Sequence, residues 1–82
     1  MSRKRSERAE ATRVTRRFAK NLVSQRRRSD LSQIATAERS GLHRTEISLL
    51  ERSKRSPRLE TIVILARGLG LKSSGDLLDG IN

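Results

Sequence analysis

Hydrophobic residues recur every three or four positions through the first third of the chain. Ala11, Val14, Phe18 and Leu22 carry this spacing, with polar or charged residues at most positions between them. A repeat of this length places apolar side chains on one face of an amphipathic helix. It therefore predicts a first helix over residues 9–27, with one face turned toward a core.

A short second helix is delimited by residues that favour helix ends. Ser29 and Asp30 interrupt the first helix, and Ser32 suits the N-cap position, where a hydroxyl accepts a backbone N–H. Gly41 suits the left-handed conformation that follows a helix C-terminus. These signals predict a helix over residues 33–40.

The middle of the chain predicts a third helix followed by a basic loop. Ile47 and Leu50 lie three residues apart, and we expect a helix over residues 43–52. The run RSKRSP at residues 52–57 contains three cations and ends in a proline, whose fixed φ favours a loop. The chain therefore leaves this helix through a strongly basic segment.

The last third is the most apolar part of the chain. Residues 62–66 are five consecutive apolar residues, a run that also fits a buried strand. Because the segment extends beyond strand length on both sides, we predict a helix over residues 59–69, ended by glycines. The SSG motif at residues 73–75 begins a last short helix. The pattern as a whole predicts an all-α fold of five helices.

The composition excludes several classes of site. The 82 residues suffice for one small domain, and 19 Lys or Arg against 9 Asp or Glu give a net charge of +10. The absence of cysteine and the single histidine exclude disulfides, zinc sites and acid–base or nucleophilic catalysis, so we expect neither an enzyme nor a cofactor. Because no apolar run approaches the roughly 20 residues that cross a bilayer and no secretory signal is present, we expect a cytoplasmic protein.

The positive charge is concentrated in the first two-thirds of the sequence. Residues 1–30 hold eleven Lys or Arg against three acidic residues, and residues 41–58 hold five against two. We divide the chain into a basic tail, residues 1–8, and a single domain, residues 9–82. The charge favours a polyanionic partner, with nucleic acid ahead of an anionic membrane surface, because the first helix has few bulky apolar residues.

The second and third predicted helices have the spacing of a helix-turn-helix. The small Ala37 allows two helix backbones to approach, and Gly41, four residues later, permits a tight turn. Leu42, Ile47 and Leu50 then fix the second helix on the first. The outward residues offer a guanidinium for guanine, hydroxyls for bases or phosphates and an apolar tip for a thymine methyl. These residues are Arg44, Thr45, Ser48 and Leu49.

Five segments between residues 18 and 71 share a known pattern: FAKNL, LSQ, AERSGL, HRTEISLLERSKRSPRL and ILARGLGL. In these segments the chain resembles the Cro/cI-type helix-turn-helix family, also called the xenobiotic response element family. The resemblance implies a five-helix, lambda-repressor-like domain that regulates transcription as a homodimer on a palindromic operator in double-stranded DNA. It places the recognition helix at about residues 43–52.

The resemblance also implies roles for individual residues. Gln33 matches a glutamine that touches the DNA backbone or supports a reading residue, and Lys54 and Arg55 match a loop along the phosphates. Arg26 and Glu51 match a buried salt bridge that joins the first helix to the recognition helix. In the competing interpretation Glu51 is a surface residue and Arg26 contacts a phosphate. The predicted DNA-contacting residues are Gln33, His43, Arg44, Thr45, Ser48, Leu49, Arg52, Lys54 and Arg55.

Two positions depart from the family pattern. Gln25 and Thr36 stand where the family has large aliphatic residues facing the core, and a buried polar group needs a partner. Val23 and Ile34 lie next to them in the sequence. Filling the lost volume with these neighbours requires a small rotation of the first or second helix.

The C-terminal apolar residues exceed what a domain of this length must bury alone. We predict that Leu71, Leu77, Leu78 and Ile81 contribute to a two-fold interface. A dimer is favoured because one recognition helix reads only about 4–5 base pairs, too few for useful selectivity. Within the family the chain resembles restriction–modification controller proteins and small phage-type repressors. An antitoxin with a toxin partner, or a protein-bridging module that does not read DNA, remains an alternative.

Overall fold

The computed structural model describes residues 2–81, and their side chains from Glu7 onward. The elements in chain order are α1 (Ser2–Arg28), α2 (Gln33–Ser40), α3 (Arg44–Glu51), α4 (Leu59–Gly68) and the 3-10 helix η1 (Ser74–Leu77). The described residues contain helices, turns and loops and no strand, which confirms the all-α prediction. The predicted fifth helix is a single 3-10 turn. No helix within the described residues has both the length and the apolar character needed to cross a membrane.

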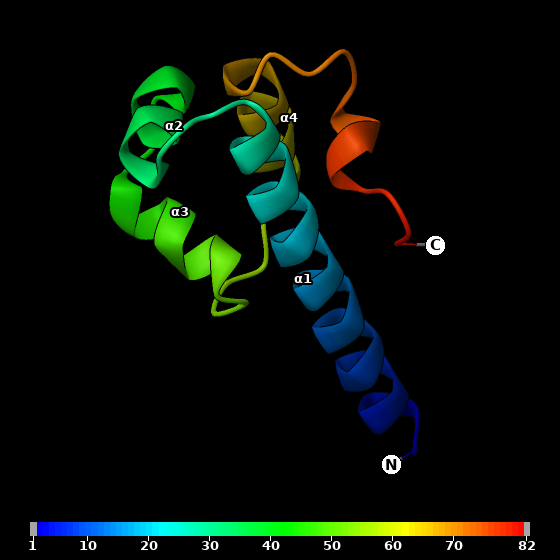
Figure 1. The fold of residues 1–82 in the computed structure, drawn as a ribbon. Coiled ribbons are helices and arrows are strands. Elements are labelled where there is room, and N and C mark those ends of the chain that lie inside the picture. The colour runs from blue at the N-terminus through cyan, green and yellow to red at the C-terminus, as the bar shows by residue number, and fades with distance from the viewer. Residues whose placement is uncertain (1, 82) are drawn as a thin grey trace.

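Helix α1 begins well before the predicted position. It starts at Ser2, whereas the predicted start at residue 9 was wrong. Residues 2–8 contain good helix formers and neither glycine nor proline, so nothing in this stretch interrupts the helix. The N-terminal half of α1 projects beyond the rest of the domain (Figure 1). The side chains of Arg3, Lys4 and Arg5, assigned to the basic tail, lie outside the described side chains.

The core forms where the second half of α1 meets the other helices. Phe18 and Leu22 of α1 pack with Leu50 of α3, Leu65 of α4 and Leu77 of η1, all essentially inaccessible to solvent. Full burial of a leucine or phenylalanine side chain contributes roughly 1.5–3 kcal/mol relative to exposure. The second half of α1 is therefore the scaffold on which the shorter helices are positioned.

The two polar positions at the core edge have different environments. Thr36 is fully buried, and its hydroxyl finds no hydrogen-bond partner among the described residues. Such a group costs about 1–3 kcal/mol of stability. Gln25 is half-buried, as is Val23 beside it. Ile34 does not fill the lost volume, because its side chain is 54% exposed.

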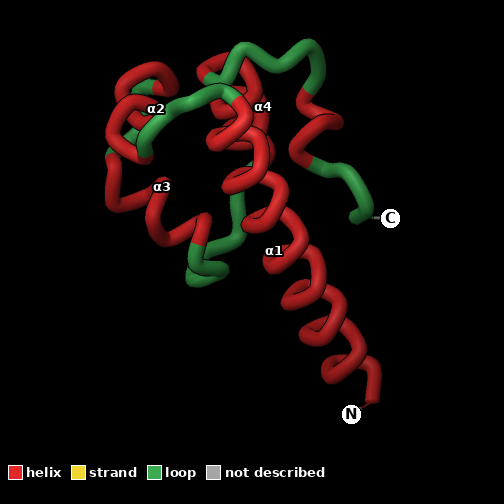
Figure 2. Tube along the Cα trace, viewed as in Figure 1, coloured by secondary structure: helices red, strands yellow, loops and turns green. Residues whose placement is uncertain are grey.

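Three side chains of α1 bind the C-terminal segment, which we define as residues 77–81. Arg13, Arg17 and Asn21 are spaced four residues apart on one face of α1, and each donates to main-chain carbonyls of this segment. Figure 2 shows the segment descending beside α1. The donor–acceptor distances are 2.7 Å from Arg13 to Ile81, 3.1 Å from Arg17 to Asp79, and 3.0 and 2.8 Å from Asn21 to Leu77 and Asp79.

Candidate nucleic-acid interface

The turn between α2 and α3 forms through the predicted cap residues. Ser32 Oγ accepts a hydrogen bond from Ala35 N at 2.9 Å, which closes the N-terminus of α2. Gly41 follows α2 with φ of +69°, a left-handed conformation that favours glycine. Leu42 N then donates to Ala37 O at 3.0 Å. These contacts turn the chain sharply and direct it into α3.

Both ends of α3 are also fixed by local contacts. His43 is the N-cap, and its Nδ1 accepts a hydrogen bond from Thr45 N at 3.4 Å. After the helix, Ser53 adopts φ of +60°, and Lys54 N donates to Leu49 O at 2.9 Å. This arrangement is a helix C-terminal motif in which the left-handed position is usually glycine. Ser53 therefore sets the direction of the basic loop at some cost in backbone strain.

Helix α3 turns one side to the core and the other away from the protein. Ile47 and Leu50 are completely buried, and they fix the helix against α1 and α2. The opposite side carries every residue that the sequence analysis assigned to base reading. Along it lie the exposed Arg44, Thr45 and Arg52 and the half-buried Ser48 and Leu49.

The structure brings Arg26 and Glu51 together in a buried ion pair. Arg26 donates from Nε to Glu51 Oε2 at 2.5 Å and from Nη2 to Oε1 at 3.1 Å, and the two side chains are only 14% and 6% exposed. Arg26 Nη1 also donates to Leu31 O at 2.8 Å. This geometry excludes the competing interpretation in which Glu51 is a surface residue.

Gln33 joins this ion pair at the start of α2. Its Nε2 donates to Glu51 Oε1 at 3.0 Å, so the amide supports α3 in this structure. This contact is with the ion pair and not with a base-reading residue, so both roles that the resemblance implied for Gln33 stay predictions. The carboxylate of Glu51 consequently accepts hydrogen bonds from both α1 and α2, which fixes the orientation of α3 relative to the scaffold.

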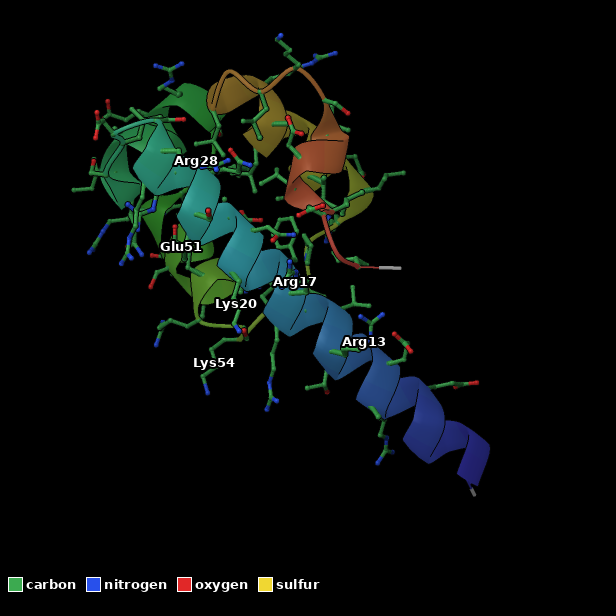
Figure 3. All side chains as sticks on the ribbon, turned by 45° about the vertical axis from the view of Figure 1, so that its right-hand side comes forward. Arg13, Arg17, Lys20, Arg28, Glu51 and Lys54 are labelled. Carbon is green, nitrogen blue, oxygen red and sulfur yellow. The ribbon has the colours of Figure 1, made fainter. Side chains whose placement is uncertain are left out.

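The basic loop after α3 borders an open groove against α1. Thr15 Oγ1 and Ser56 Oγ lie 2.8 Å apart in a hydrogen bond that ties the two walls together. In Figure 3, Lys20 and Lys54 lie on this side of α1, whereas Arg13 and Arg17 lie toward the C-terminal segment. We call this feature the cationic groove. Its cations are Arg16, Lys20, Arg27 and Arg28 from α1 and Arg52, Lys54 and Arg55 from the loop.

The sequence analysis did not single out the individual cations that α1 contributes to this groove. Arg16 and Lys20 are four residues apart, a spacing that places both on one helix face. That signal was present, but it could not show which other element faces them. Asn21 was missed as well, because its carbonyl partners lie 56 and 58 residues away in the chain.

The predicted dimer residues divide into two groups. Leu77 is completely buried in the core, so its assignment to an interface is corrected: it supports the chain's own fold. Leu78 is 38% exposed, and Leu71 and Ile81 are half-buried. The sequence analysis did not identify two exposed apolar residues of α4. These are Leu59, 75% exposed, and Ile64, 37% exposed.

Comparisons with known proteins agree with this geometry. The family model described as Helix-turn-helix matches residues 22–77, which include all of α2, α3 and α4. Control protein C.SmaI of Serratia marcescens is 49% identical over 52 residues, which are 63% of this chain and 62% of that protein. The crystal structure of the hypothetical transcription factor NHTF from Neisseria matches with a TM-score of 0.75 and 31% identity, over 79% of this chain and 74% of that one.

Proposed function

The chain belongs to the helix-turn-helix family, of the Cro/cI type, and we propose that it regulates transcription by reading duplex DNA with α3. This family comprises DNA-binding transcription regulators and not enzymes. Among the groups that the sequence left open, we favour the controller proteins, because the curated relative is a control protein. A protein that acts on bacterial promoters works in the cytoplasm, and we propose that location.

The observation that carries the proposal is the contrast between the two sides of α3. Its inner side is fixed by buried leucine and isoleucine and by the Arg26–Glu51 pair, so the helix is held rigidly before any ligand binds. Its outer side carries the exposed Arg44, Thr45 and Arg52 and the half-buried Ser48 and Leu49. A rigid helix with such a face fits the major groove of B-DNA.

We assign base reading to the residues at the start and middle of α3. Arg44, the first helical residue, offers two parallel N–H donors to O6 and N7 of a guanine. Thr45 and Ser48 offer hydroxyls to base edges or to phosphates. Leu49 is half-buried, and its exposed part suits a thymine methyl group.

Phosphate contacts flank this reading surface at both ends of the helix. His43 and Gln33 lie at the N-termini of α3 and α2, where the helix dipole attracts anions. Arg52, Lys54 and Arg55 follow the C-terminus of α3. Gln33 is bonded to Glu51 through one of its two amide N–H groups, and the second remains available for a phosphate oxygen.

We further propose that the protein binds a palindromic operator as a homodimer. One copy of α3 spans only about 4–5 base pairs, and two half-sites one DNA turn apart recover affinity and selectivity. Ile64 of α4 and Leu78 after η1 supply the exposed apolar surface for this contact. We include Leu59, which is 75% exposed, and the half-buried Leu71 and Ile81 among the residues of this contact.

Selection from random duplex oligonucleotides with the purified protein tests the DNA-binding proposal. We expect a palindromic consensus whose half-sites are separated by one helical turn. Arg44→Ala should lose discrimination between the selected and random duplexes, whereas Arg67→Ala, at an exposed cation of α4, should keep it. Recovery of no consensus at all would contradict sequence-specific reading.

Sedimentation velocity tests the dimer. The double variant Ile64→Glu/Leu78→Glu should sediment as a monomer at concentrations where the unchanged protein is a dimer. Ile34→Glu alters an exposed apolar residue on α2 and serves as the control. A monomer under all conditions, with and without DNA, would exclude the proposed assembly.

A further inference from the structure

We infer that the cationic groove is a second DNA-binding surface, which takes phosphates of the strand that flanks the site read by α3. This inference rests on the proposed function and extends it to α1, which contributes no base-reading residue. It names Arg16, Lys20 and Arg27 as phosphate-binding residues. The ligand of the groove is one strand of duplex DNA. Three features support this ligand: the charge of the groove, the spacing of its cations and its position next to α3.

The first argument is the unneutralised charge in the groove. Among the described residues that line it, the only carboxylate belongs to Glu51, and the Arg26 guanidinium already binds that carboxylate. The described residues provide no ion-pair partner for Arg16, Lys20, Arg27 or the cations of the loop. Gathering like charges on two facing elements opposes folding unless a polyanion occupies the space between them.

The second argument is the spacing of the cations along α1. At 1.5 Å per residue, Arg16 and Lys20 are separated by about 6 Å along the helix axis, and Lys20 and Arg27 by about 10 Å. Separations of this size allow the three cations to reach different phosphates of one strand, because successive phosphates are offset by about 3.4 Å along the duplex axis alone. Ala19 and Val23 form an apolar floor between them, and the Thr15–Ser56 hydrogen bond holds the walls together.

The third argument is the position of the groove next to the reading helix. The loop wall begins at Arg52, directly after α3 ends at Glu51. With α3 in the major groove, one phosphate backbone passes its C-terminal end, where Lys54 and Arg55 lie. A strand that continues past these residues meets the α1 wall at Lys20 and Arg16.

Two cations of α1 that neighbour this surface are not part of it, because the C-terminal segment engages them. Arg13 and Arg17 donate to carbonyls of the C-terminal segment, and Figure 3 shows them on the side away from Lys54. Arg13 and Arg17 are therefore engaged by the protein's own main chain, whereas Arg16, Lys20 and Arg27 have no ion-pair partner among the described residues. This difference in partners makes the inference specific to Arg16, Lys20 and Arg27.

The salt dependence of DNA binding tests the inference. Fluorescence anisotropy with a labelled duplex of random sequence would compare the unchanged protein with Arg16→Gln/Lys20→Gln and with Arg67→Gln/Lys72→Gln, which removes two exposed charges elsewhere. Each lost phosphate contact lowers the slope of log K against log salt by about 0.9, so the groove variant should lose about 1.8. Between about 50 and 200 mM salt the unchanged protein should then lose about tenfold more affinity than the groove variant.

A charge-conserving variant and a series of duplexes complete the experiment. Arg16→Lys/Lys20→Arg should restore the slope, because it keeps both charges. With the selected operator, lengthening the flanks should strengthen binding of the unchanged protein but not of the groove variant. If the groove variant keeps the slope of the Arg67/Lys72 control, the inference is overturned while reading by α3 stands. If the unchanged protein binds no duplex, the proposed function and the inference fail together.

Discussion

The helix-turn-helix and the C-terminal segment are held by different kinds of contact. In the helix-turn-helix, caps at Ser32, Gly41 and His43 act within a few residues, and one buried ion pair joins α3 to the scaffold. The C-terminal segment depends on side-chain donors of α1 that lie 56 to 68 residues away in the chain. The reading element is thus determined mainly by local sequence, and the C-terminal segment by tertiary structure.

The two regions also differ in the group that is left without a partner when one side chain of a contact is removed. Removing Glu51 leaves the Arg26 guanidinium charged and buried without its counterion, which is costly. Removing a donor to the C-terminal segment frees neutral carbonyls, several of which water can reach. Disruption of the first region should therefore destabilise the whole domain, and disruption of the second should release one segment.

The largest expected effect is that of Glu51→Ala. Loss of one partner of a buried pair costs about 3–5 kcal/mol, which in a domain of this size lowers Tm by about 12 °C or more. Thermal unfolding followed by circular dichroism measures this change. Glu38→Ala, at an exposed position on α2, is the control and should leave Tm nearly unchanged. An unaltered Tm for Glu51→Ala would mean that the pair does not hold α3.

Asn21→Ala should have the next largest effect, at about 2 kcal/mol, because one buried amide makes two hydrogen bonds. Hydrogen exchange should show the amides of Leu78 and Ile81 losing protection before those of α3 do. Ser24→Ala, at an exposed position of the same helix, should leave both regions unchanged. Equal loss of protection in α3 and the C-terminal segment would contradict the separation of the two regions.

Thr36→Val should stabilise the helix-turn-helix by about 1–2 kcal/mol, because it replaces a buried hydroxyl that lacks a partner with a methyl group of similar size. The measurement is the midpoint of urea unfolding, which should rise with an unchanged m-value. The same substitution at the exposed Thr12 serves as the control. A lower midpoint for Thr36→Val would show that the hydroxyl is satisfied in solution.

The smallest expected effect is that of Ser53→Gly. Glycine relieves a left-handed strain of about 1–2 kcal/mol but loses about 0.5–1 kcal/mol to chain entropy, so a net gain below about 1 kcal/mol is expected. Asp30, with φ of 56°, offers a comparison, since aspartate tolerates this conformation better than serine does. Asp30→Gly should therefore gain less than Ser53→Gly in the same unfolding measurement.

The sequence could predict those parts of the fold that depend on neighbouring residues. Ser32 and Gly41 act on backbone groups within three or four residues, and the observed bounds of α2 are those expected from them. The start of α1 was misplaced because a polar, basic stretch resembles a disordered tail even when its residues favour a helix. Composition alone does not distinguish these two states.

The parts that the sequence could not predict depend on which elements face one another. From the sequence alone, Leu77 fits an interface as well as a core, because the position of η1 relative to α1 is not known. The structure shows that Leu77 is completely buried in the core. Asn21 stands between Lys20 and Leu22 in the sequence, and only the position of distant carbonyls gives it a partner. The cationic groove could not be predicted for the same reason, since its walls come from the first helix and from a loop in the middle of the chain.

The acceptors bound by Arg13, Arg17 and Asn21 are main-chain carbonyls, and every type of amino acid carries the same carbonyl. The hydrogen bonds themselves therefore place no demand on the side chains of residues 78–81. Other contacts do constrain two of them: Ile81 packs against the core, and Gly80 has φ of +75°, where an added Cβ would lie 2.7 Å from the Arg17 guanidinium. Substitutions at the exposed Leu78 and Asp79 can therefore change the outer surface of this stretch, and with it the choice of a partner, without removing the hydrogen bonds that fix the path of the backbone.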